Sequence, residues 1–129
     1  MSRWVVENIG LDVPWHFTAF HPDYKMLDKP RTPALTLTRA RDIAMGRGVR
    51  HVYTGNVHDR AGQSTYCHGC GATLIDRDWY VLSAWNLTDD GCCRRCGVRC
   101  PGVFDGAPGH WGARRLPVRL ADFVEAEAR

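Results

Sequence analysis

Two short cysteine motifs limit the fold of this chain more than any other feature. Segments 67–71 (CHGCG) and 93–97 (CRRCG) share the pattern C-x-x-C-G, and 22 residues separate them from Cys70 to Cys93. Two intervening residues let one tight turn present both thiolates to the same ion, and the glycine lets the backbone curl with its N–H groups toward sulfur. The pattern therefore predicts a tetrahedral metal site with four ligands: Cys67, Cys70, Cys93 and Cys96.

A site filled by four protein thiolates has no position for water or substrate, so we expect a structural ion rather than a catalytic one. Zinc is the preferred metal, a rubredoxin-like iron is the alternative, and disulfides come third. Cys92 and Cys100 are left over, and Cys92 competes with Cys93 as a ligand because the two are adjacent. Metal binding contributes about 10–16 kcal/mol in zinc-finger peptides. A module of roughly 45 residues needs such a contribution, since its core is small.

Residues before the cysteine motifs predict a strand, a helix and a second strand. A short helix over residues 3–8 comes first, and residues 13–20 then read as a strand with Trp15, Phe17 and Ala19 on one face. Thr32 is a suitable N-cap for a helix with Pro33 in its first turn. Residues 50–54 form the next strand, which makes a parallel βαβ unit. The helix carries a modest apolar stripe: Leu37, Ala40, Ile43 and Ala44.

Composition changes after residue 56, where Gly, Asp, Cys and Arg rise and the helical period disappears. Residues 73–87 read as two short strands that join the cysteine motifs. The predicted fold class is therefore α+β: a partial (β/α) barrel fragment of one βαβ unit, followed by a small β-rich, zinc-ribbon-like module. We expect the βαβ part over residues 1–57, the module over 58–120, and a short terminal helix or tail over 121–129.

Side chains at the carboxyl ends of parallel strands line the active sites of α/β barrels. After the first strand these positions supply Thr18, His21, Asp23 and Lys25 as candidates. After the second strand they supply Tyr53 and Asn56. His21 is equally well explained as a capping or packed histidine, and His16, in the middle of its strand, is expected to be a core group or to support such a site. No catalytic residue is assigned.

Charge and segment composition exclude some classes of protein. The formal net charge of +3 is mild, and we interpret the arginines near the second motif as a solvated face, with nucleic-acid contact as the alternative. No stretch approaches the roughly 20 apolar residues of a membrane span, and residues 1–20 contain no uninterrupted apolar run of a signal peptide. We expect a cytoplasmic protein with no membrane partner, a compartment in which six cysteines point to metal.

Several segments resemble the C-terminal half of the radical S-adenosylmethionine protein of the AmmeMemoRadiSam system, which is similar to pyruvate formate-lyase activating enzymes with an added zinc-ribbon-like tail. The resemblance covers about residues 3–120. It is carried by residues 13–26 (VPWHFTAFHPDYKM), 53–57 (YTGNV), 64–67 (STYC) and 111–118 (WGARRLPV). It implies that the strand-end candidates, His21 and Asn56 among them, help line the pocket of a larger barrel.

The cluster-binding C-x-x-x-C-x-x-C motif of that family lies in its N-terminal half, which has no counterpart here. The cysteines of this chain do not rebuild it, because Cys92, Cys96 and Cys100 are each four positions apart and the next position that the motif needs is Val103. An iron–sulfur cluster and S-adenosylmethionine are therefore expected only if another polypeptide completes the barrel. A full eight-stranded barrel takes about 250 residues. The expected partner is the missing N-terminal half, or a second copy of the chain, on the strand edges of residues 11–20 and 49–55.

Three hypotheses remain open, in this order. The chain is the C-terminal part of a radical enzyme that is not competent alone, or a stand-alone zinc-ribbon adaptor for protein or nucleic acid, or an inactive remnant stabilised by its metal. The substrate of the intact family does not follow from these residues.

Overall fold

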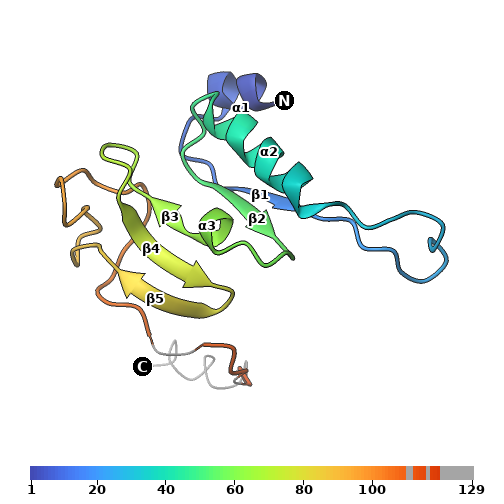
Figure 1. Ribbon diagram of the computed structural model, residues 1–129. Helices are drawn as coiled ribbons and strands as arrows, with labels where there is room; N and C mark the ends of the chain where they lie inside the picture. Colours follow the sequence, from blue (N-terminus) through green and yellow to red (C-terminus); the bar gives the residue numbers. More distant parts are fainter. Residues whose placement is uncertain (110–111, 116, 120–129) are drawn as a thin grey trace.

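A computed structural model describes residues 1–109, 112–115 and 117–119 of this 129-residue chain, and the predicted terminal helix over 121–129 lies outside them. The fold is mixed α+β with two small sheets (Figure 1). Its elements in chain order are α1 (Ser2–Asn8), β1 (Trp15–Thr18), α2 (Ala34–Met45), β2 (Val52–Gly55), α3 (Arg60–Gln63), β3 (Thr65–Tyr66), β4 (Thr73–Asp78) and β5 (Val81–Trp85). Within the described residues, no helix is long and apolar enough to cross a membrane.

The first sheet pairs β1 with β2 in parallel, in a register that aligns Trp15 with Val52 and Thr18 with Gly55. Helix α2 connects the two strands, so the predicted βαβ unit is present. Residues alternate along β1, and Trp15 and Phe17 pack against buried Ala44, Val49 and Val52. This apolar cluster holds α2 on one face of the sheet (Figure 1).

Three local predictions in this part were wrong. Pro33, not Thr32, occupies the N-cap position of α2, and no side chain caps that helix. The Thr32 hydroxyl instead accepts a hydrogen bond from the Phe20 N–H at 3.0 Å, and the Thr32 N–H donates to the Phe20 carbonyl at 2.9 Å. These two bonds close a loop over residues 21–31 that extends away from the sheet (Figure 1). Ile43 is 54% exposed rather than packed in the stripe of α2. His16 lies on the exposed face of β1, so it is not the core group that was one of its two predicted roles.

The second sheet is antiparallel with the order β3-β4-β5. Strands β4 and β5 form a hairpin whose turn contains Trp79 and Tyr80. Buried Leu74, Ile75 and Leu87 pack with three cysteines, Cys67, Cys93 and Cys100, into one core cluster. The apolar core of this part is therefore built around the predicted metal ligands.

Helix α3 joins the two parts and contacts both β2 and β4 (Figure 1). Asp59 caps it, because its carboxylate accepts a hydrogen bond from the Gly62 N–H at 2.9 Å. The Arg60 guanidinium pairs with the Asp76 carboxylate on β4. Gln63, the last residue of α3, is also buried where the two parts meet. Both α3 and β3 were absent from the sequence prediction.

Candidate metal centre

The two cysteine motifs have the same backbone hydrogen bonds. The Gly71 N–H donates to the Cys67 carbonyl at 2.9 Å, and the Gly97 N–H donates to the Cys93 carbonyl at 2.8 Å. The N–H groups of Cys67 and Cys93 donate to the carbonyl of the residue five positions later, at 2.8 and 2.9 Å. Each motif is therefore a closed turn, and the two turns follow β3 and β5 at the same end of the second sheet.

Gly71 and Gly97 occupy the position after the second cysteine because of their backbone conformation. Their φ angles are +70° and +76°. A Cβ atom at either position would meet no heavy atom within 4 Å, so space is not the constraint. L residues with a side chain rarely adopt this left-handed conformation, whereas glycine does so without steric cost.

The four thiols converge on one point. The Sγ atoms of Cys67, Cys70, Cys93 and Cys96 all lie within 4.8 Å of one another. The Sγ of Cys67 is 3.5 Å from that of Cys96, and the Sγ of Cys70 is 3.8 Å from that of Cys93. A tetrahedral ion with metal–sulfur bonds of about 2.3 Å separates its sulfur ligands by about 3.8 Å. The residues present therefore fit a single tetrahedral ion, and the site is compatible with zinc.

The pKa values of two of these thiols shift in opposite directions. Burial raises the pKa of the Cys93 thiol, but the backbone N–H groups of Cys96 and Arg95 outweigh burial and lower this pKa to about 7. The Val98 N–H favours the Cys96 thiolate, yet the thiol of Cys70 and burial outweigh it and raise that pKa to about 12. A divalent cation would lower the pKa of all the coordinating thiols, because metal ligation favours their deprotonated form.

The thiols of the two remaining cysteines contact other groups of the chain. The Cys92 thiol donates to the Asp90 carboxylate at 3.4 Å, which directs it away from the four converging sulfurs. Cys100 is 3% exposed, and its thiol lies 3.8 Å from the Pro101 carbonyl. The structure therefore groups Cys93, and not its neighbour Cys92, with the other three ligands.

The strand-end candidates divide into two groups. Tyr53 and Asn56 line a cavity of about 310 Å³ at the carboxyl end of the parallel sheet. Thr18, His21, Asp23 and Lys25 do not line this cavity. His21, Asp23 and Lys25 lie on or next to the loop that extends from the sheet, where the Asp23 carboxylate accepts a hydrogen bond from its neighbour's N–H and Lys25 lies 5.2 Å from the Tyr24 ring centroid.

The same cavity has a second wall that the sequence did not reveal. This wall comes from α3 and the β4–β5 hairpin: Gln63, Arg77, Trp79 and Tyr80. His16 also borders the cavity, and its ring stacks on that of Tyr53 with centroids 5.1 Å apart. Gln63, Arg77, Trp79 and Tyr80 lie 7 to 24 positions after Asn56, and no local pattern joins them to it.

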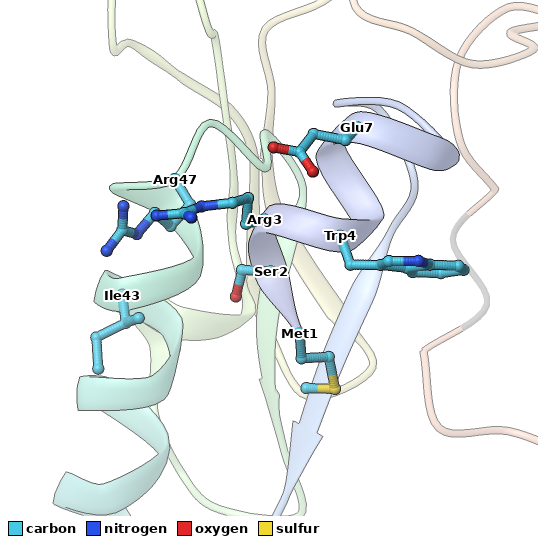
Figure 2. A pocket seen from close by; sticks show the side chains of 7 residues that line it. All are labelled: Met1, Ser2, Arg3, Trp4, Glu7, Ile43 and Arg47. Atoms are coloured by element: carbon cyan, nitrogen blue, oxygen red, sulfur yellow. The ribbon is translucent and has the colours of Figure 1, made fainter.

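A shallow hollow of about 480 Å³ lies between α1 and α2 (Figure 2). Trp4 is 60% exposed and points away from α2, and Ile43 is exposed on α2 itself. Arg3, Glu7 and Arg47 contribute charged groups of both signs. Apolar and charged side chains are therefore mixed around this hollow, and Glu7 lies on α1 while Arg47 lies on α2.

Comparisons with known proteins yield one relative. No family model matches the chain, and no solved structure matches it. The uncharacterised protein MJ0808 of Methanocaldococcus jannaschii is 43% identical over 96 residues, which are 74% of this chain. The matched segment is 28% of the relative, so the chain spans little more than a quarter of that protein's length. The likeness identifies a segment shared with a longer protein and assigns no activity to it.

Proposed function

We propose that this chain is the C-terminal part of a radical S-adenosylmethionine enzyme of the AmmeMemoRadiSam or pyruvate formate-lyase activating type. In this proposal residues 1–57 supply one βαβ unit of a (β/α) barrel. Residues 58–120 form a zinc-ribbon-like module around one structural zinc ion. The chain is not competent alone, because the motif that binds the iron–sulfur cluster is absent from it.

The observation that carries this proposal is the open parallel sheet. Strands β1 and β2 each have one hydrogen-bonded neighbouring strand within the described residues. Parallel sheets occur almost only as buried layers of several strands, and an unpaired edge is a template for pairing with another chain. A partner that adds strands on either side of β1–β2 would turn this unit into part of a barrel.

Two further observations support a missing partner. The relative from M. jannaschii is much longer than the matched segment, so a related segment exists within a larger polypeptide. The hollow between α1 and α2 exposes Trp4 and Ile43, which are 60% and 54% accessible. Trp4 points away from α2, so the two side chains form no single patch, but each is a large apolar group that a partner could cover.

The radical chemistry of such enzymes does not fit this chain alone. A radical enzyme's cluster needs three thiolates at suitable reach, and four of the six cysteines converge on the single-ion site. Only Cys92 and Cys100 remain, and they make separate local contacts. We therefore assign no step of cluster or S-adenosylmethionine chemistry to residues of this chain.

The proposed zinc has a structural role. Its four ligands come from the turns that follow β3 and β5, so one ion would tie both ends of the hairpin together. Cys67 and Cys93 are 3% and 2% exposed and belong to the apolar cluster of the module. A closed shell of four thiolates offers no coordination position to a substrate.

A complementation experiment tests this function. The zinc-loaded chain is co-expressed with the part of the M. jannaschii relative outside the matched segment, and each polypeptide is also expressed alone. We expect a one-to-one complex that contains iron and sulfide and, when dithionite is added as the electron donor, cleaves S-adenosylmethionine. The chain alone should show neither cluster absorbance nor cleavage.

Failure of the two polypeptides to associate would contradict the proposal. So would a complex that forms but binds no iron. The alternative of a stand-alone adaptor predicts a different result, in which the isolated chain binds an oligonucleotide with an affinity that falls as salt rises. A titration in which the isolated chain shows no binding to an oligonucleotide would count against that alternative.

A further inference from the structure

The cavity at the carboxyl end of the parallel sheet, hereafter the strand-end pocket, is built from two parts of the fold. Its volume is about 310 Å³, which is at the small end of the range for small-molecule sites. One wall is the end of β2, and the other is the tip of the β4–β5 hairpin. The metal-stabilised module therefore contributes half of a pocket whose other half belongs to the βαβ unit.

The hairpin wall is held in place by one buried side chain. Gln63 is 8% exposed, and its amide donates to the Val57 carbonyl at 2.8 Å. The carbonyl oxygen of the same amide accepts a hydrogen bond from the Trp79 N–H at 2.9 Å. Trp79 has a φ angle of +52°, a conformation that bulky residues rarely adopt and that often occurs at functional sites. The hairpin tip is thus fixed to α3 before any ligand arrives.

Several polar side chains of the pocket already have partners. The Asn56 amide is bonded to both backbone groups of Ala19, and the Thr54 hydroxyl donates to the Asp59 carboxylate at 3.0 Å. Both ends of the Gln63 amide are occupied as well. These groups shape the pocket, and they are not available to a ligand without breaking those bonds.

The polar groups that remain favour an anion. The Arg77 side chain makes no hydrogen bond or ion pair within the described part of the chain, and the Tyr80 hydroxyl and the His16 ring nitrogens make no hydrogen bond there. No carboxylate is among the described residues that line the pocket. A guanidinium presents paired N–H donors that match a carboxylate. Trp79 and Tyr80, which are 46% and 70% exposed, add aromatic surface beside that charge.

We propose that the strand-end pocket binds a small carboxylate that carries a planar group, with Arg77 contacting the carboxylate and Trp79 contacting the planar group. The groups named in this proposal, Arg77 and Trp79, both belong to the present chain. The inference therefore stands independently of a partner polypeptide and of radical chemistry. Arg77, Trp79 and Tyr80 also border a larger hollow of about 880 Å³ along β5, so the test must distinguish the two locations.

The test is a titration of the zinc-loaded full chain with benzoate, followed by backbone and indole N–H chemical shifts. Benzamide, which has the same shape without the charge, is the matched probe. We expect benzoate to shift the signals of Gly55, Asn56 and the Trp79 indole, with smaller changes at Ser83 and Ala84 on β5. Benzamide should bind more weakly by about tenfold, because the contact with a charged partner is lost.

Two arginine variants isolate the charged contact. Arg77→Gln should weaken benzoate binding by about tenfold. Arg39→Gln, an equal change of net charge on exposed α2 surface, should leave binding unchanged. Trp79→Leu provides an independent variant and should also weaken binding, since it removes the aromatic surface.

Several outcomes would overturn the proposal. These are an absence of shifts at Gly55 and Asn56, shifts confined to β5, equal binding of benzoate and benzamide, or equal effects of Arg77→Gln and Arg39→Gln. The titration uses the chain without a partner, so its failure would leave the complementation result unaffected, and the reverse also holds.

Discussion

The side chain of Asn56 pairs with the backbone of Ala19 across 37 positions of sequence. The Asn56 Oδ1 accepts a hydrogen bond from the Ala19 N–H at 2.7 Å, and the Asn56 Nδ2 donates to the Ala19 carbonyl at 2.8 Å. Regular pairing of β1 with β2 ends one residue earlier, at Thr18 and Gly55. The amide therefore replaces one further backbone pair and fixes the carboxyl ends of both strands. Asn56 itself has a φ angle of +47°, which asparagine tolerates better than most residues.

Replacing Asn56 should destabilise the protein in two separable ways. Asn56→Gly keeps the backbone conformation but removes both hydrogen bonds, and we expect a loss of about 1–3 kcal/mol in the free energy of unfolding. Asn56→Ala should cost about 1 kcal/mol more, because alanine is strained at positive φ. Urea denaturation of the zinc-loaded chain measures both. A glycine variant as stable as the parent would show that the amide bonds contribute nothing.

Substitution of the glycine that ends either cysteine motif, Gly71 or Gly97, should weaken metal retention. Gly97→Ala places a side chain at a φ angle of +76°, although no atom lies within 4 Å of its Cβ. We expect a loss of about 1–2 kcal/mol in stability, and earlier metal release to a competing chelator. Gly109→Ala is the control, since its Cβ also meets open space and its φ lies outside the left-handed region. Equal behaviour of these two variants would mean that backbone conformation does not limit the site.

Adjacent cysteines offer a matched pair of ligand variants. Cys93→Ser should reduce bound metal far below one ion per chain, because its sulfur is one of the four that converge. Cys92→Ser should retain a full ion, because its thiol instead contacts the Asp90 carboxylate. Metal content per chain after gel filtration distinguishes the two. If the Cys92 variant lost its metal and the Cys93 variant kept it, Cys92 would be the ligand and Cys93 would not.

His51 should make stability depend on pH. It is 6% exposed, and its Nε2 atom has no hydrogen-bond partner among the residues that the structure describes. Burial lowers the pKa of His51 from its ordinary value, the carboxylate of Asp12 opposes this shift, and His68 and Arg50 add to it. The unfolded chain therefore binds the proton more tightly than the folded chain. Stability is fully present above a pH of about 6.5 and falls as pH drops toward the folded pKa.

The test of this pH effect compares the parent with His51→Leu. Both retain the same four cysteines, so acid-induced loss of metal affects them alike. We expect the urea midpoint of the parent to fall more steeply than that of His51→Leu between a pH of about 7 and 5.5. Parallel pH profiles would show that His51 is not protonated on unfolding in this range.

The cysteine site was predictable from the local spacing of its residues. Features that depend on contacts between residues far apart in the sequence were not predictable. The C-x-x-C-G pattern encodes a complete turn, so the ligands could be named before their distances were known. Trp15 and Phe17 alternate with exposed residues along β1, so the half-buried face of this strand was also predictable from local spacing. Helix α3 is only four residues long, and its single local signal is the Asp59 cap to Gly62.

The strand-end pocket illustrates what sequence patterns leave out. Tyr53 and Asn56 were expected to line a pocket because they follow a parallel strand. Arg77 and Trp79 join them only because α3 turns the chain back and Gln63 ties the hairpin tip to it. Thr32 shows the opposite case, in which a residue suited to capping a helix closes a loop against Phe20 instead.

The most direct test of the central claim is the X-ray absorption fine structure of the metal bound to the full chain. A single ion held by the four converging thiolates predicts a first shell of four sulfur atoms at about 2.3 Å, with no nitrogen or oxygen neighbour. A shell with fewer than four sulfurs, or one that includes light atoms, would contradict a closed site formed by Cys67, Cys70, Cys93 and Cys96.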